Sequence, residues 1–170
     1  MNQREERIRK FEQIRDLPYR IGIGREADCS CETKARLLSD EFAGLGLQSR
    51  LVGCTFRWSE LNIPREILNL APSDVDAHAY LQVRLPERKR WVAVDPSWDP
   101  ALNAVLPVAR WDGLNSTRLA VKARNKAVVE SPCTKSSEAR MPPRFSRAES
   151  RFLRAINKFL QTVRETRRAS

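Results

Sequence analysis

The sequence predicts an α+β fold in which a cysteine-bearing helix packs on an antiparallel sheet. Residues 31–43 begin with a cysteine and carry apolar side chains at helical spacing. Residues 76–95 alternate as two strands joined by a short basic turn, and residues 147–168 have the pattern of an added amphipathic helix. The length of 170 residues suits a single domain with a real core.

The predicted helix over 31–43 places a thiol in its first turn. Ala35, Leu38 and Phe42 follow Cys31 at helical spacing, so we expect one face of this helix to be buried. The first turn is the positive end of the helix macrodipole. That position favours the thiolate, which is the nucleophilic form of cysteine.

The predicted hairpin carries the chain's single histidine and an aspartate. His78 lies early on the first strand and Asp95 ends the second, so antiparallel pairing brings the two side chains near one another. Cys31, His78 and Asp95 are the parts of an activated cysteine, in which the imidazole takes the thiol proton and the carboxylate orients the ring. Each residue alone also suits an ordinary role, as a buried thiol, a hydrogen-bonded strand histidine or a turn-forming aspartate.

Three stretches of the sequence resemble the transglutaminase-like superfamily of papain-like folds. Residues 31–52 are similar to its cysteine helix and following strand. Residues 78–83 (HAYLQV) resemble its histidine strand, and residues 91–97 (WVAVDPS) resemble its aspartate strand. The resemblance covers residues 19–100 and implies a papain/transglutaminase-like core.

The resemblance implies Cys31 as nucleophile, His78 as base and Asp95 as orienting acid. It also implies an enzyme that acts on an amide or peptide bond through a thioester, as a hydrolase or an acyltransferase. The substrate would be a protein, a peptide or a small amide. Cys29 does not match the family pattern, because the downstream motif aligns on Cys31.

The residues around Cys31 bear on the choice between hydrolysis and transfer. The backbone N–H of Cys31 is a natural donor to an oxyanion. The resemblance implies that cross-linking members use a tryptophan upstream of the nucleophile as a second donor, and this chain has none before Cys31. Tyr19 is the nearest upstream aromatic hydroxyl. Hydrolysis of an amide is therefore at least as well supported as cross-linking.

The chain divides into three predicted segments. Residues 1–130, which include a predicted helix over 4–16, form the catalytic domain. Residues 131–146 contain three prolines among Ser, Thr and Lys and are typical of a linker. Residues 147–168 form a basic amphipathic helix, which a capping box at its start supports.

The predicted domain also contains a long connection and two short β-like segments. The long excursion over 59–77 is either a place for substrate selection or a solvated connector. Residues 119–121 and 127–129 are β-like, and we expect both to be edge strands.

The C-terminal helix combines an apolar face with a basic one. Residues 146–170 hold seven basic and two acidic residues, which is half of the chain's net charge of +10. The apolar face favours docking on the core, while the basic face suits an acidic partner, a membrane surface or nucleic acid. Poor interleaving of aromatic and basic residues, and the lack of a known motif, argue against nucleic acid. The alternative function is a non-catalytic scaffold or binding protein that uses this helix for a partner.

The cysteines at positions 29, 31, 54 and 133 lack the paired spacing of a zinc site. We expect free thiols, with Cys54 as a small buried hydrophobe, and no metal or other cofactor. The sequence has no apolar run long enough to span a membrane. Its charged first residues are not followed by the apolar stretch of a secretory signal, so we expect a cytoplasmic protein.

Overall fold

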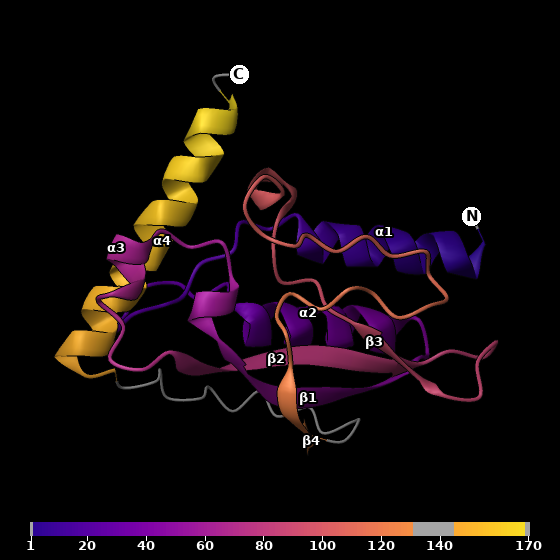
Figure 1. The fold of residues 1–170 in the computed structure, drawn as a ribbon. Coiled ribbons are helices and arrows are strands. Elements are labelled where there is room, and N and C mark those ends of the chain that lie inside the picture. Colours follow the sequence, from indigo (N-terminus) through magenta and orange to yellow (C-terminus); the bar gives the residue numbers. More distant parts are fainter. Residues whose placement is uncertain (1, 131–144, 169–170) are drawn as a thin grey trace.

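The computed structural model describes residues 2–130 and 145–168 and has an α+β architecture (Figure 1). Its helices and strands are α1 (Gln3–Arg15), α2 (Cys31–Gly44), β1 (Gln48–Arg57), α3 (Arg65–Leu68), β2 (Val75–Arg84), β3 (Trp91–Val94), β4 (Arg124–Glu130) and α4 (Arg147–Arg168), with short 3-10 helices over Trp58–Glu60 and Pro100–Leu102. Within these described ranges, four strands form an antiparallel sheet in the order β3-β2-β1-β4. The predicted α+β class is therefore confirmed.

The cysteine-bearing helix α2 packs on the sheet, as predicted. Leu38 and Phe42 of α2 share a core cluster with Leu81 and Val83 of β2. Tyr80, which points to the opposite side of β2, belongs to a second and larger cluster. In Figure 1, α1 lies along α2 on the side away from the sheet, so the helices and the sheet form successive layers.

Helix α4 begins at the predicted capping box and docks on the core. The Ser146 hydroxyl accepts a hydrogen bond from the N–H of Glu149 (3.2 Å), and the Ser146 N–H donates to the Glu149 carboxylate (2.7 Å). Phe152, Ile156 and Leu160 are almost fully buried in the larger core cluster. Figure 1 shows α4 beside α3 at one end of the sheet. Docking of its apolar face, which was one of the alternatives from the sequence, is confirmed.

One of the two predicted edge strands does not form. Residues 127–129 lie in β4, as expected, but residues 119–121 are irregular. The backbone of Ala120 bonds to side chains instead of to a strand: its N–H donates to Asp95 (2.8 Å) and its carbonyl accepts from the Trp98 indole (3.0 Å). The apolar side chains in this segment pack into the core without joining the sheet.

The predicted linker falls mostly outside the described residues. Residues 131–144 of the predicted 131–146 segment, and Cys133 among them, lie outside the described ranges. Phe145 is half-buried against the core cluster that also contains α4.

We expect Gly113→Ala to lower the free energy of unfolding by about 1–3 kcal/mol. Gly113 has a φ of +77°, and an added Cβ would lie 2.9 Å from Cγ of Arg4 and 3.1 Å from Cγ1 of Ile8, both on α1. The substitution therefore combines backbone strain with displacement of a helix. Urea unfolding measures the change.

The matched control is Gly44→Ala. Gly44 is the last residue of α2, has no positive φ and has no heavy atom within 4 Å of an added Cβ. This substitution should be neutral or should stabilise the protein by up to about 1 kcal/mol. Equal effects of the two substitutions would contradict the packing of α1 on residue 113.

Candidate active site

Cys31 is the first residue of α2, so its thiol lies at the N-terminal end of that helix. Asp28 organises the chain around it, because its carboxylate accepts hydrogen bonds from the backbone N–H groups of Gly22 (2.7 Å) and Ser30 (3.2 Å). The same carboxylate accepts from the hydroxyl of Thr33 in the first turn. The turn at Gly22 and the start of α2 thus meet at one carboxylate, which holds residues on both sides of Cys31.

The His78 ring contacts the Asp95 carboxylate, with 2.8 Å between Nε2 and Oδ2. His78 belongs to β2 and Asp95 directly follows β3, its antiparallel neighbour. The two residues are only 5% and 1% exposed. Because Asp95 engages Nε2, Nδ1 is the ring nitrogen left to face Cys31, which is close enough to His78 to raise its pKa. The structure therefore brings His78 and Asp95 into direct contact, with Cys31 in their neighbourhood.

The environment holds His78 and Asp95 as an ion pair. Burial opposes the charged imidazolium, but the negative charges of Asp95 and of a Cys31 thiolate, with hydrogen bonds to both, outweigh it. The pKa of His78 consequently lies well above its usual value of 6.5. Burial would likewise raise the pKa of Asp95, but the His78 charge and several hydrogen bonds lower it below the usual 3.8.

Hydrogen bonds from Ser97 and Ala120 also fix the Asp95 carboxylate. Oδ2 also accepts from the Ala120 N–H (2.8 Å), while Oδ1 accepts from the N–H (3.1 Å) and the hydroxyl (2.5 Å) of Ser97. The N–H of Asp95 donates to the Thr117 hydroxyl (3.0 Å). Ser97 could have been found from the sequence, since a polar residue two positions after an aspartate is typical of such a turn. Thr117 and Ala120 are 22 and 25 residues away, and no local pattern points to them.

Tyr19 packs in the core cluster against which Cys31 lies. A hydrogen bond with the backbone of Cys31 is among the influences on the pKa of the Tyr19 hydroxyl, which places the hydroxyl beside the start of α2. The ring packs on Trp98, with 4.5 Å between ring centroids, and the residue is 6% exposed. Burial, reinforced by the nearby negative charge of Cys31, raises the pKa of Tyr19 well above its usual 10.0. The hydroxyl therefore keeps its proton at neutral pH and can donate it in a hydrogen bond.

A buried lysine ties α2 to two other segments of the site. The Lys34 ammonium donates to the backbone carbonyls of Arg15, Leu17 and Ser97, each at 2.8 Å. Burial lowers the pKa of Lys34 to about 8. No sequence signal marks this role, because a lysine on an amphipathic helix is expected to be exposed.

The other described thiols differ from Cys31 in their surroundings. Cys29 and Cys54 are free cysteines, and burial raises the pKa of both thiols. Cys54 is 5% exposed, which confirms its predicted burial. Neither thiol therefore has the environment of an activated nucleophile.

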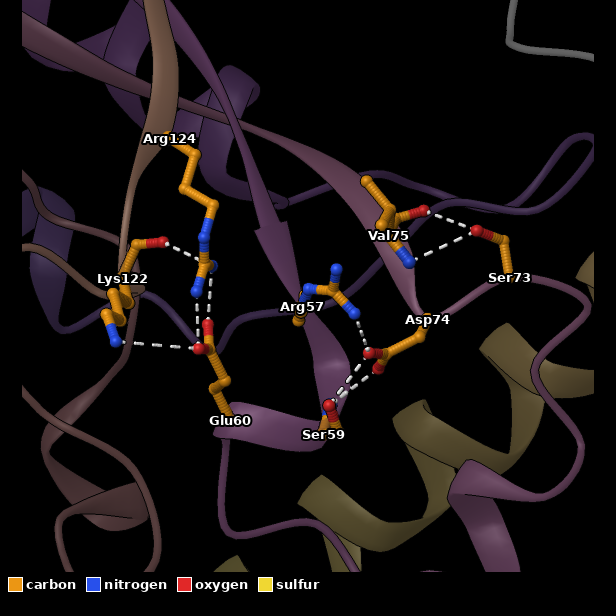
Figure 2. Close-up of polar contacts among 8 residues, drawn as sticks. All are labelled: Arg57, Ser59, Glu60, Ser73, Asp74, Val75, Lys122 and Arg124. Carbon is orange, nitrogen blue, oxygen red and sulfur yellow. Dashed lines mark hydrogen bonds and ion pairs between the residues drawn. The ribbon is translucent and has the colours of Figure 1, made fainter.

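Ion pairs fasten the excursion over 59–77 to the sheet (Figure 2). Figure 2 shows Glu60 facing Arg124, whose guanidinium donates to both carboxylate oxygens at 2.5 and 2.6 Å. Near the other end of the excursion, Asp74 accepts from the N–H and the hydroxyl of Ser59, both at 2.8 Å. The two ends of this segment are thus held together.

Residues 2–130 and 145–168 contain no group of three or more His, Cys, Asp or Glu side chains that could hold a metal ion. Over the same residues, no helix is both long enough and apolar enough to cross a membrane. Comparisons with known family models, with curated proteins and with solved structures found no match. The assignment of a function therefore depends on the site geometry and on the motifs that flank Cys31, His78 and Asp95.

We expect Asp95→Asn to lower the free energy of unfolding by about 3 kcal/mol, because it leaves a buried imidazolium without its carboxylate. The raised pKa of His78 means that its contribution is present at low pH and is lost as the pH rises through that pKa. The lowered pKa of Asp95 means that its contribution is lost as the pH falls through that pKa. The loss should therefore be largest between about pH 4 and about pH 6.5.

Urea unfolding over a range of pH measures this loss, in a Cys31→Ser background that removes the thiol. Asp40→Asn is the control, since Asp40 is an exposed carboxylate on α2. Its substitution should change the unfolding free energy little at any pH. A loss for Asp95→Asn that is absent, or that does not vary with pH, would contradict the ion pair.

Proposed function

We propose that this chain is a transglutaminase-like cysteine enzyme with a papain-like core, acting on an amide or peptide bond through a thioester. The observation that carries the proposal is the buried contact of His78 with Asp95 at 2.8 Å, beside a Cys31 that raises the pKa of the same ring. The order of the three residues along the chain and their flanking motifs support the same family. Residues 1–130 are the catalytic domain in this proposal, and α4 follows it.

In this proposal the thiol proton of Cys31 rests on Nδ1 of His78, and Asp95 stabilises the imidazolium, so the reaction begins from the Cys31 thiolate. The thiolate attacks the substrate carbonyl carbon, so that a carbon–sulfur bond forms and an electron pair moves onto the oxygen. The backbone N–H of Cys31 stabilises this oxyanion. His78 then gives the proton to the leaving amine as the carbon–nitrogen bond breaks, which leaves a thioester. Water or a second amine attacks the thioester, loses a proton to His78 and releases the product and the free thiol.

Hydrolysis is the outcome that the local residues favour. The family resemblance associates cross-linking with a tryptophan upstream of the nucleophile, and this chain has no tryptophan before Cys31. Tyr19 lies beside the Cys31 N–H instead. This departure from the cross-linking pattern supports a hydrolase that takes a peptide or a small amide.

The outer face of α4 supports a second candidate function, in which the chain binds an acidic partner. Arg147, Arg151 and Lys158 are exposed on α4, whereas its apolar face is buried against the core. A basic surface of this kind attracts negatively charged partners. This function does not involve Cys31, so thiol chemistry separates the two candidates.

The enzyme proposal predicts that iodoacetamide alkylates Cys31 faster than Cys29 or Cys54. Cys31 has the His78 base within reach, whereas burial raises the pKa of the other two thiols. His78→Ala should slow alkylation of Cys31 about 100-fold, because it removes the group that accepts the proton. Timed labelling followed by peptide mass spectrometry measures the rate at each cysteine.

Cys54→Ser is the matched control, since it changes a neighbouring thiol and should leave the rate at Cys31 unchanged. Equal labelling of all accessible thiols, with no effect of His78→Ala, would remove the case for an enzyme. A screen of peptides and small amides, comparing wild type with Cys31→Ala, then finds the substrate. Trapping of a hydroxamate by hydroxylamine reports the thioester itself. With an alkyl primary amine in its place, a carboxylic acid product indicates hydrolysis and a substituted amide indicates transfer.

A further inference from the structure

Residues 19–21, which precede Cys31 in the chain, form an isolated β-bridge and have hydrogen-bond partners on both sides of the backbone. Arg20 forms an antiparallel bridge with Cys29: the Arg20 N–H donates to the Cys29 carbonyl (3.2 Å), and the Cys29 N–H donates to the Arg20 carbonyl (2.9 Å). In an extended chain, the backbone N–H and C=O groups of successive residues point to opposite sides. Because those of Arg20 point toward Cys29, those of Tyr19 and Ile21 point away from it.

Side chains from α4 and from the loop after β3 occupy the side that faces away from Cys29. The Tyr19 N–H donates to Oδ2 of Asp99 (3.0 Å), and the Tyr19 carbonyl accepts from Nη2 of Arg164 (2.8 Å). The Ile21 N–H donates to Oδ1 of Asn157 (3.0 Å), and its carbonyl accepts from Nδ2 of the same side chain (2.8 Å). All four backbone groups of the two residues are thus held by side chains.

The spacing of these contacts matches the geometry of both elements. Asn157 and Arg164 are seven residues apart, which places them on one face of α4 two turns apart. Tyr19 and Ile21 are two residues apart, which places their backbone groups on one strand edge. Side chains on α4 therefore take the place that a neighbouring β-strand would take.

The ion pair between Arg164 and Asp99 makes this attachment rigid. Two guanidinium nitrogens of Arg164 donate to the two oxygens of Asp99, at 2.7 and 3.2 Å. Arg164 is 7% exposed and Asp99 is 3% exposed. A bidentate pair of this kind fixes direction as well as distance, and breaking it would leave a buried charge without a partner.

We propose that Asn157 and Arg164 of α4 are positioning residues that hold Tyr19 in place, so that the Tyr19 hydroxyl acts with the Cys31 N–H as an oxyanion donor. Tyr19 is the catalytic residue in this account, since its hydroxyl would touch the substrate oxygen and donate a hydrogen bond as charge develops there. The inference rests on the proposed function, because an oxyanion arises only if Cys31 attacks a carbonyl. It makes α4 part of the active site.

Two reagents that attack the same sulfur can separate this role from a purely structural one. Acylation of Cys31 by p-nitrophenyl acetate passes through a tetrahedral oxyanion, whereas alkylation by iodoacetamide displaces iodide and forms no oxyanion. Both reactions need the thiolate. A residue that acts through the oxyanion site should change acylation and spare alkylation.

The experiment measures both rates at Cys31 in full-length wild type and in Tyr19→Phe, Asn157→Ala and Arg164→Lys, with Cys31→Ala as the baseline. Each of the three substitutions should lower acylation about tenfold or more and leave alkylation within about twofold. Lys158→Ala changes an exposed neighbour on α4 and should leave both rates unchanged. Adding Asn157→Ala to Tyr19→Phe should lower acylation no further, because both act through one hydroxyl.

The opposing results are distinct. Equal losses of both rates in the α4 variants, no loss of acylation in Tyr19→Phe, or additive losses in the double variant would each overturn the positioning role. Arg164→Lys keeps the buried positive charge, and Asn157 is only half-buried, so neither substitution should greatly destabilise the fold. If one variant nevertheless unfolds, the other still tests the positioning role. A separate result would overturn the proposed function itself: iodoacetamide alkylating Cys31 at the same rate in His78→Ala as in the wild type.

Discussion

The buried contact between His78 and Asp95 is the interaction on which the rest of the site depends. An imidazolium and a carboxylate taken out of water are costly unless each is paired and fully hydrogen-bonded. The Asp95 carboxylate is paired with His78 and also accepts a hydrogen bond from the N–H of Ala120. Residues 116–120 take an irregular path because they supply this hydrogen bond. The His78 ring also lies near the rings of Phe56 and Tyr80, at 6.3 and 6.4 Å between centroids. Its orientation is therefore set by the protein before any substrate arrives.

Two buried cations extend this constraint to the segments around Cys31. Lys34 joins α2 to the carbonyl of Ser97, two residues after Asp95. Arg164 joins α4 to Tyr19 and to Asp99. Helix α2, the loop after β3 and helix α4 are thus connected through charged side chains with little freedom to move. In this arrangement α4 stabilises the site instead of extending away from it.

The sequence could predict what depends on local pattern. Periodicity placed Cys31 at the start of a helix, and alternation predicted the paired strands that carry His78 and lead into Asp95, because both signals lie within a few adjacent residues. The sequence could not predict the contacts of Asn157 and Arg164, which join residues 136 and 145 positions apart. The wrong strand over 119–121 has a similar cause, since the partners of that backbone are distant side chains.

Nuclear magnetic resonance titration of His78 tests the central claim most directly, because the chain has a single histidine and its ring signals need no separation from others. The account predicts a titration midpoint well above 6.5 in the wild type, and a lower midpoint in both Asp95→Asn and Cys31→Ala. A wild-type midpoint at or below 6.5 that neither substitution moves would contradict it. That result would leave His78 without a charged partner on either side of its ring.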